Sequence, residues 1–154
     1  MTTTLKDADR LGWPTLSVAR SREVDTIAIE EFSISGMTLM ENAGKACADR
    51  LLDEWESNAS SATSPLVLAG GGNNGGDGFV IARCFRERGM NYRALLLTSI
   101  DRLKGDAKTS YERAIAAGVC IESIVDANRL KHAIDDHHGP ILDCLLGTGA
   151  KGPL

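Results

Sequence analysis

The second half of the chain alternates between short apolar segments and longer amphipathic ones, and this alternation limits the possible folds more than any other feature. Amphipathic segments with helical spacing separate four apolar runs of strand length, which read "LVLAG", "YRALLLTS", "VCIESI" and "PILDCLLG". A strand followed by a helix and another strand forms a right-handed crossover, which makes the two strands parallel. The alternation therefore predicts a parallel sheet with helices on both faces.

Local signals place the elements more closely. The run "LVLAG" has no polar alternation, which is typical of a strand buried on both faces of a parallel sheet. We expect helices at residues 78–89, 106–118 and 126–136. Gly89 and Gly118 are expected to end the first two, and Asp126 is expected to cap the third.

Two further helices are predicted before the first strand, because apolar residues recur at helical spacing in residues 18–32 and 37–56. They are expected to cover one side or an edge of the sheet. The predicted class is α/β, a Rossmann-like three-layer αβα fold with a mainly parallel sheet and two N-terminal helices. We expect residues 1–17 to form an extension and residues 18–154 to form one domain. Because the chain stops in a glycine loop after the fourth strand, we expect the C-terminal part of that domain to be missing.

Composition excludes several classes of partner. With 154 residues, of which 43% are hydrophobic, the chain has material for one core. The 17 basic and 21 acidic residues give a net charge of -4, which argues against a nucleic-acid or anionic-membrane surface. No apolar run approaches the roughly 20 residues that span a bilayer, and the N-terminus resembles no targeting peptide. We expect a cytoplasmic protein whose four cysteines, Cys47, Cys84, Cys120 and Cys144, are reduced and packed.

Two glycine loops follow predicted strands: "GGGNNGGDGF" after the first and "GTGAKGP" after the fourth. In open parallel sheets, ligands bind beyond the carboxyl ends of the strands, where the strand order reverses. A strand, a glycine loop and a helix N-terminus together suit a diphosphate. A Walker-type phosphate loop is excluded because no Gly-Lys-Ser/Thr follows.

The first loop contains the dinucleotide fingerprint as Gly70, Gly72 and Gly75. That fingerprint is weak unless an acidic residue ends the second strand, about 20 residues on. Here the second strand ends in "LLLTSID", so Thr98 and Ser99 stand at that position and Asp101 comes later. The hypothesis of an ordinary nicotinamide dehydrogenase is therefore supported by the three glycines alone.

Oxygen-bearing side chains distinguish this loop from a plain phosphate cradle. Asn73, Asn74 and Asp77 would suit a hard cation or a polyhydroxylated ligand. An alternative is structural: the asparagines tolerate left-handed turn geometry, and Asp77 caps a helix that starts near Gly78.

A second carboxylate, Asp143, lies in the otherwise apolar run "ILDCLLG". We expect it to be buried, where an unpaired carboxylate costs several kcal/mol, and to meet a cation or hydrogen-bond donors opposite Asn74. Asp143 is thus the candidate catalytic residue.

Four blocks of the sequence carry more specific information. These are "EVDTIAIEEFSISGMTLMENAGKA", "AGGGNNGGDGFVIAR", "LKGDAKTSYERAIAAGV" and "ILDCLLGTGAKGPL". In this order they closely resemble the YjeF amino-terminal domain family, the NAD(P)HX epimerases, over about residues 18–154. The run "GGGNNGGDGFVIAR" is highly specific for that family.

The resemblance implies an isomerase that interconverts the R and S epimers of hydrated NADH and NADPH in nicotinamide nucleotide repair. It implies that Asn74 and Asp143 help to bind a potassium ion. The implied partners are an ADP/ATP-dependent NAD(P)HX dehydratase, separate or fused, and a second copy in a homodimer. The substrate contacts that it implies are Asn73, Asn74, Gly75, Gly76 and Asp77, and around the diphosphate Gly147, Thr148, Gly149, Ala150, Lys151, Gly152 and Pro153.

The chain departs from the family at its end. The family continues with a strand that bears an Asp-x-Pro-Ser-Gly-type segment, which this sequence lacks. That segment supplies another carboxylate near the substrate and a serine for the cation. A catalytically impaired fragment, or a non-catalytic binding or scaffold module on the same fold, is therefore the alternative hypothesis.

Overall fold

The computed structural model describes residues 16–57 and 64–149, apart from the side chains of residues 54–57. Two compact units divide between Ser35 and Gly36. The first contains helix α2 (Val18–Glu30), which the spacing in residues 18–32 predicted. Ser17 caps this helix, because its hydroxyl accepts a hydrogen bond from the backbone N–H of Arg20 at 3.2 Å.

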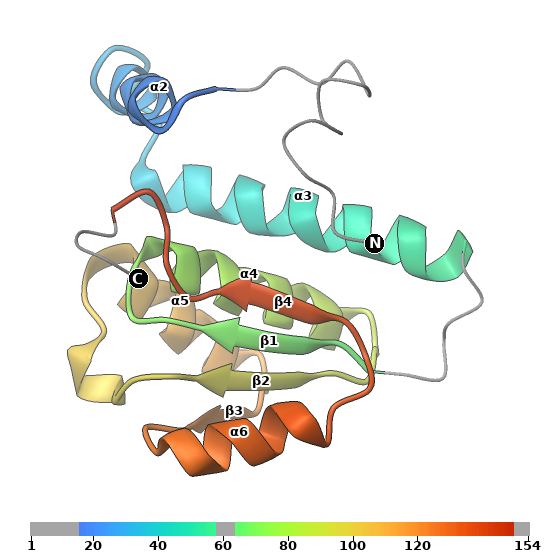
Figure 1. Cartoon of the computed structure of the whole chain (residues 1–154). Helices are drawn as coiled ribbons and strands as arrows, with labels where there is room; N and C mark the ends of the chain where they lie inside the picture. The colour runs from blue at the N-terminus through green and yellow to red at the C-terminus, as the bar shows by residue number, and fades with distance from the viewer. Residues whose placement is uncertain (1–15, 58–63, 150–154) are drawn as a thin grey trace. The chain divides into compact units, whose positions relative to one another are not determined.

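The second unit contains a four-stranded sheet and its covering helices (Figure 1). All three strand pairings are parallel and the strand order is β3-β2-β1-β4, so the order reverses between β1 and β4. The alternation of strands and helices is confirmed. The elements are α3 (Gly36–Ser57), β1 (Leu66–Ala69), α4 (Asn73–Glu87), β2 (Arg93–Leu96), the 3-10 helix η1 (Ile100–Arg102), α5 (Gly105–Ala116), β3 (Ile121–Ser123), α6 (Ala127–Asp135) and β4 (Ile141–Cys144).

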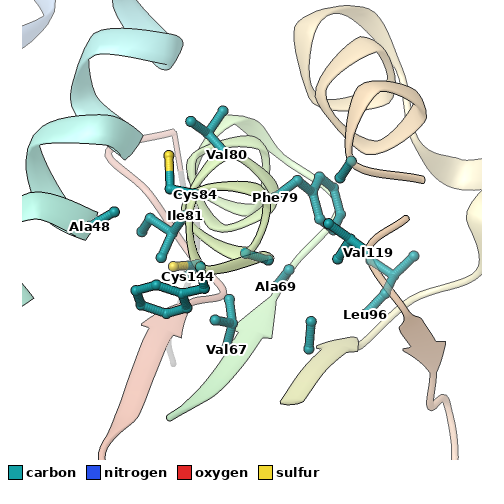
Figure 2. Packing of buried hydrophobic residues seen from close by; sticks show 14 of the residues in the cluster. Ala48, Val67, Ala69, Phe79, Val80, Ile81, Cys84, Leu96, Val119 and Cys144 are labelled. Carbon is teal, nitrogen blue, oxygen red and sulfur yellow. The ribbon is translucent and has the colours of Figure 1, made fainter. Parts of the chain in front are cut away.

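Helices cover both faces of this sheet, as predicted. Val67 and Ala69 of β1 pack in the large cluster beneath α4, whereas Leu66 and Leu68 pack in a smaller cluster with α6. All four residues of β1 are buried, which confirms a strand covered on both faces. Figure 2 shows α4 above the sheet, with Phe79 on the side of Val119 and Leu96 and with Ile81 and Cys84 on the side of Ala48.

The predicted helix ends are also present. Asp126 accepts a hydrogen bond from the backbone N–H of Arg129 at 2.8 Å and caps α6. Gly89 and Gly118 follow α4 and α5 with φ of 69° and 81°, a conformation that favours glycine. These signals act over a few residues, so the local sequence was enough to find them.

The start of α4 differs from the prediction. The helix begins at Asn73 with Gly72 as its N-cap, so the predicted start near Gly78 was wrong, and Asp77 lies inside the helix and does not cap it. The left-handed alternative for the two asparagines was also wrong, because Ser33 is the one described non-glycine residue with positive φ. Three glycines near the helix start, Gly75, Gly76 and Gly78, give it low intrinsic propensity, and tertiary packing overrides that propensity here.

That packing is a close approach of α4 to the end of β1. A Cβ atom on Gly75 would lie 1.9 Å from the carbonyl oxygen of Gly70. A Cβ on Gly76 would lie 2.5 Å from the sulfur of Met40 on α3. The first turn of α4 therefore fits between β1 and α3 because these positions carry no side chain.

A cluster of ion pairs joins the helices α3, α4 and α5. The carboxylate of Glu41 on α3 pairs with Arg83 on α4, and with Arg113 on α5 at 3.2 Å. Lys45, one turn along α3, lies 3.6 Å from the same carboxylate. The Glu41 and Arg83 side chains are only 14% and 17% exposed, so solvent screens this pair less than it would screen a surface pair.

We predict that Gly75→Ala lowers the free energy of unfolding by about 3 kcal/mol, because the new methyl group meets backbone that cannot rotate away. Urea unfolding followed by circular dichroism measures the change. Gly72→Ala is the matched control: a Cβ there meets no atom of the described residues within 4 Å, so it should cost only the preference for Gly over Ala at an N-cap, about 1 kcal/mol. Equal effects of the two substitutions would contradict the packing role.

Glu41→Gln should lower the free energy of unfolding by about 1–3 kcal/mol, because Arg83 and Arg113 lose a charged acceptor. Glu122→Gln removes the acceptor of an exposed pair with Arg129 and should cost less than about 0.5 kcal/mol. Thermal and urea unfolding of both variants give the comparison. If Glu41→Gln lowers the free energy of unfolding no more than Glu122→Gln does, the cluster of ion pairs does not stabilise the fold as proposed.

Candidate functional site

The two glycine loops predicted from the sequence lie against each other where the strand order reverses. The backbone N–H of Gly70 donates to the carbonyl of Cys144 at 2.9 Å. A Cβ on Gly70 would lie 2.2 Å from the carbonyl oxygen of Leu145, and one on Gly147 would lie 3.2 Å from the Cβ of Asn74. The loops after β1 and β4 therefore form one surface at the carboxyl edge of the sheet, which is where ligands bind in such folds.

Asn74 joins the first turn of α4 to the loop after β4. Its side-chain Nδ2 donates a hydrogen bond to the carbonyl of Leu146 at 3.2 Å. An amide has its oxygen on the opposite side from its nitrogen, so the Oδ1 of Asn74 is turned away from this carbonyl. It is an oxygen of the kind that a cation or a ligand hydroxyl would bind.

Asp143 is exposed, so the predicted burial of this carboxylate was wrong. The reason is topological: in the part of the chain that the structure describes, β4 is an edge strand, paired with β1 alone. Its Oδ1 accepts a hydrogen bond from the backbone N–H of Leu145 at 3.0 Å. Desolvation therefore does not oblige this carboxylate to meet a cation or further donors. What remains is a carboxylate with one local partner, open to water, at the edge of the site.

A cavity of about 550 Å³ lies between α3, α4 and β4. This volume is in the range of small-molecule sites. Asn74, Asp77 and Asp143 all line it, so the structure brings together three of the side chains that the sequence singled out. The other lining residues are Ala43, Ala46, Cys47, Arg50, Leu51, Ile81, Leu142 and Cys144.

Sequence reasoning missed the contribution of α3. This helix supplies the small residues Ala43 and Ala46, together with Cys47, Arg50 and Leu51. The signal was the run of small side chains in "ENAGKACA", which leaves room beside a helix that otherwise has bulky core residues. The sequence alone does not reveal the cavity, because a stripe of small side chains serves helix contacts as readily as it borders a cavity.

Burial raises the pKa of the Cys144 thiol to about 12, and the charges of Asp77, Cys47 and Asp143 add to the effect. The thiol therefore stays protonated at neutral pH and provides neither a base nor a nucleophile. The contributions of Asp77 and Asp143 show that both carboxylates send negative potential into this region. Such a potential favours a cation over a second anion.

The cysteine prediction was half wrong. Cys84 and Cys144 are buried, whereas Cys47 and Cys120 are exposed. Cys47 faces the cavity beside α3, and Cys120 directly precedes β3, the strand at the other edge of the sheet. An apolar neighbourhood in sequence does not by itself cover a residue that borders a cavity or an edge.

The remaining predicted contacts fall into three groups. Gly75 and Gly76 are buried, whereas Asn73 is exposed at the start of α4. Three predicted residues are exposed in the loop after β4: Gly147, Thr148 and Gly149. Four lie outside the described residues: Ala150, Lys151, Gly152 and Pro153.

No helix within residues 16–57 and 64–149 is long and apolar enough to cross a membrane. In the same residues, no group of three or more His, Cys, Asp or Glu side chains could hold a metal ion.

Comparison with known proteins gives concordant results. The NAD(P)H-hydrate epimerase of Rhodopirellula baltica is 41% identical over 144 residues, which are 92% of this chain and 55% of that protein. The protein of the same name from Pirellula staleyi is 37% identical, over 86% of this chain and 57% of that protein. The bifunctional NAD(P)H-hydrate repair enzyme Nnr of Thermofilum pendens is 35% identical, over 90% of this chain and 26% of that protein. The chain spans about half the length of the first two relatives.

The fold has a solved counterpart. The crystal structure of the yeast protein ynu0 superimposes with a TM-score of 0.76 at 24% identity, over 92% of this chain and 60% of that one. This likeness supports the three-layer α/β architecture. The model of the family "YjeF-related protein N-terminus" matches residues 36–154, a range that includes the sheet and both glycine loops. The chain belongs to the family of YjeF-related protein N-terminal domains.

Proposed function

We propose that this chain provides an NAD(P)H-hydrate epimerase domain, which interconverts the R and S epimers of hydrated NADH and NADPH. The observation that carries the proposal is the convergence of Asn74, Asp77 and Asp143 on one cavity beside two glycine loops. Relatives named NAD(P)H-hydrate epimerase support it. A nucleotide needs backbone donors for its diphosphate, and its reacting ring needs polar side chains close by.

The glycine loops would hold the diphosphate. Gly72 is exposed, and a Cβ on it would meet no atom of the described residues within 4 Å. A ligand can therefore come close to its backbone, at the N-terminus of a 15-residue helix. Helix N-termini present free N–H groups and a positive dipole end to anions. The exposed Gly147, Thr148 and Gly149 would close on the diphosphate from the other side.

The reaction needs proton transfer and no redox change. The substrate's hydroxyl sits on a carbon attached to the ring nitrogen, so its configuration can invert by loss and return of water or by ring opening. Either route needs a proton donor and a proton acceptor near that carbon. Asp143 is the proposed catalytic carboxylate, because it is exposed and lines the cavity. Cys144 is unsuited to the role because its thiol is protonated at neutral pH.

Potassium is the proposed cofactor, held by Asn74 and Asp143. The donor set suits a hard cation, since it consists of a carboxylate, an amide oxygen and the adjoining backbone carbonyls. The negative potential from Asp77 and Asp143 also favours a cation. When bound, the ion would offset the charge of these carboxylates and of the substrate's diphosphate. The side chains themselves would orient the hydroxyl-bearing ring against the cavity wall of α3.

The proposed partners follow from the same chemistry. A dehydratase that accepts one epimer would consume the product, and relatives named bifunctional repair enzymes are consistent with a fused partner. A homodimer is the proposed oligomeric state.

We predict that the protein accelerates repair of the R epimer when an S-specific dehydratase is present. The assay follows loss of hydrate by absorbance of the regenerated reduced nicotinamide, with dehydratase alone as the background. Asp143→Asn should lower the added rate by about 100-fold or more, as loss of a catalytic acid or base does. The control is Asp49→Asn, whose carboxylate pairs with Arg88 outside the lining of this cavity. No gain over background by the unmodified chain would refute the proposed activity.

Potassium should raise the melting temperature of the protein, and Asp143→Ala should remove that rise. A site filled at 100 times its dissociation constant stabilises the fold by about 2.7 kcal/mol. Thermal unfolding in potassium chloride is compared with unfolding in choline chloride at equal ionic strength. Asp49→Ala should keep the potassium response. If Asp143→Ala also keeps it, the ligand assignment is wrong.

A further inference from the structure

The segment after β2 borders the first glycine loop, and the proposed function leaves this segment unused. A Cβ on Gly71 would lie 3.2 Å from the Cγ2 atom of Thr98. The backbone N–H of Leu97 donates to the carbonyl of Ala69 at 2.9 Å, so β1 and β2 remain joined up to the start of their loops. A nucleotide seated on the glycine loop would therefore have Thr98 as a neighbour.

Thr98 is held in place from the opposite side as well. The hydroxyl of Ser123 on β3 donates to the carbonyl of Thr98 at 2.8 Å. The backbone N–H of Ile124 donates to the carbonyl of Leu96 at 2.9 Å. Contacts from β1 and β3 thus fix the position of this segment before any ligand arrives, and a binding group on fixed backbone loses little entropy when it binds.

The chemistry of the segment differs from that of a site for an unphosphorylated ribose. In dinucleotide folds, a carboxylate at the end of β2 binds the 2′-hydroxyl of the adenosine ribose, whereas a nearby arginine accommodates a 2′-phosphate. Here the half-buried Thr98 and Ser99 stand at that position, and both carry hydroxyl donors. The exposed cations Arg102 and Lys104 follow within six residues of Thr98.

One carboxylate lies in the segment, Asp101 in η1. A hydrogen bond from the Ser99 side chain, followed by one from its own backbone, lowers the pKa of this exposed group. Its negative charge is therefore already paired with local donors. It is outnumbered by Arg102 and Lys104 on the same segment, so the net charge offered to a ligand is positive.

We propose that residues 98–104 form a subsite for the adenosine 2′-phosphate, so that the chain prefers the hydrate of NADPH to that of NADH. The inference rests on the proposed function and deepens it. The hydroxyl of Thr98 donates to a phosphate oxygen, and Arg102 supplies the charge-assisted contact, while the Ser99 hydroxyl stays on Asp101. The absence of a carboxylate at the ribose position removes the repulsion that would exclude a 2′-phosphate.

Binding of two nucleotide fragments to the whole chain tests this subsite. Isothermal titration calorimetry compares adenosine 2′,5′-bisphosphate with adenosine 5′-monophosphate, which lacks the 2′-phosphate. The bisphosphate should bind about 10-fold more tightly or better, the size expected of one hydrogen bond to a charged group. Arg102→Gln should remove most of this difference and leave the monophosphate affinity unchanged within about 2-fold.

Two further variants make the result decisive. Thr98→Asp places a carboxylate at the ribose position, so this variant should bind adenosine 5′-monophosphate more tightly than the bisphosphate. Arg93→Gln, at the opposite end of β2, should leave both affinities unchanged. Equal binding of the two fragments by the unmodified chain would overturn the subsite alone, as would a preference that survives both Arg102→Gln and Thr98→Asp. Failure of both fragments to bind, together with no epimerase activity, would overturn the proposed function as well.

Discussion

The close contact between the first turn of α4 and the end of β1 is the constraint on which the rest of the site depends. Gly75 reaches the carbonyl of Gly70 with no side chain between them. The backbone N–H of Gly70 in turn donates a hydrogen bond to the carbonyl of Cys144, and Gly70 lies against Leu145. One glycine contact therefore sets the separation of α4, β1 and the loop after β4. Any side chain at these positions would push α4 outward and separate Asn74 from Leu146.

The position of α3, which forms one wall of the cavity, depends on ion pairs. Helix α3 approaches α4 closely at Gly44, where a Cβ would lie 2.5 Å from the Cβ of Val80, and the cluster around Glu41 also joins the two helices. Glu41 precedes Ala43, Cys47 and Leu51 on the same helix. Loss of the Glu41 ion pairs would therefore displace the α3 residues that line the cavity. The cavity thus combines two kinds of constraint: contact between glycines, which is short and rigid, and ion pairing, which is stronger where solvent is excluded.

Most of the fold could be predicted from the sequence because its signals are local or periodic. The four strands, their parallel pairing, the Asp126 cap and the glycines after α4 and α5 all follow from spacing over a few residues. The start of α4 could not be predicted in this way. Three glycines in its first two turns argue against a helix by propensity, and the contact that favours the helix joins residues of separate elements.

The candidate site shows the same division. Its motif residues Asn74, Asp77 and Asp143 were found from residue type and from their position in or after predicted strands, because parallel strands bring their carboxyl ends to one edge. The exposure of Asp143 could not be predicted, since flanking apolar residues cannot reveal whether a strand lies at the edge of a sheet. The lining from α3 and the contact of Gly71 with Thr98 were also hidden. The sequence by itself determined the element order, the family and the polar groups at the carboxyl edge. Only the tertiary structure decided which of these groups share a cavity and which are open to solvent, because burial depends on neighbours distant in the chain.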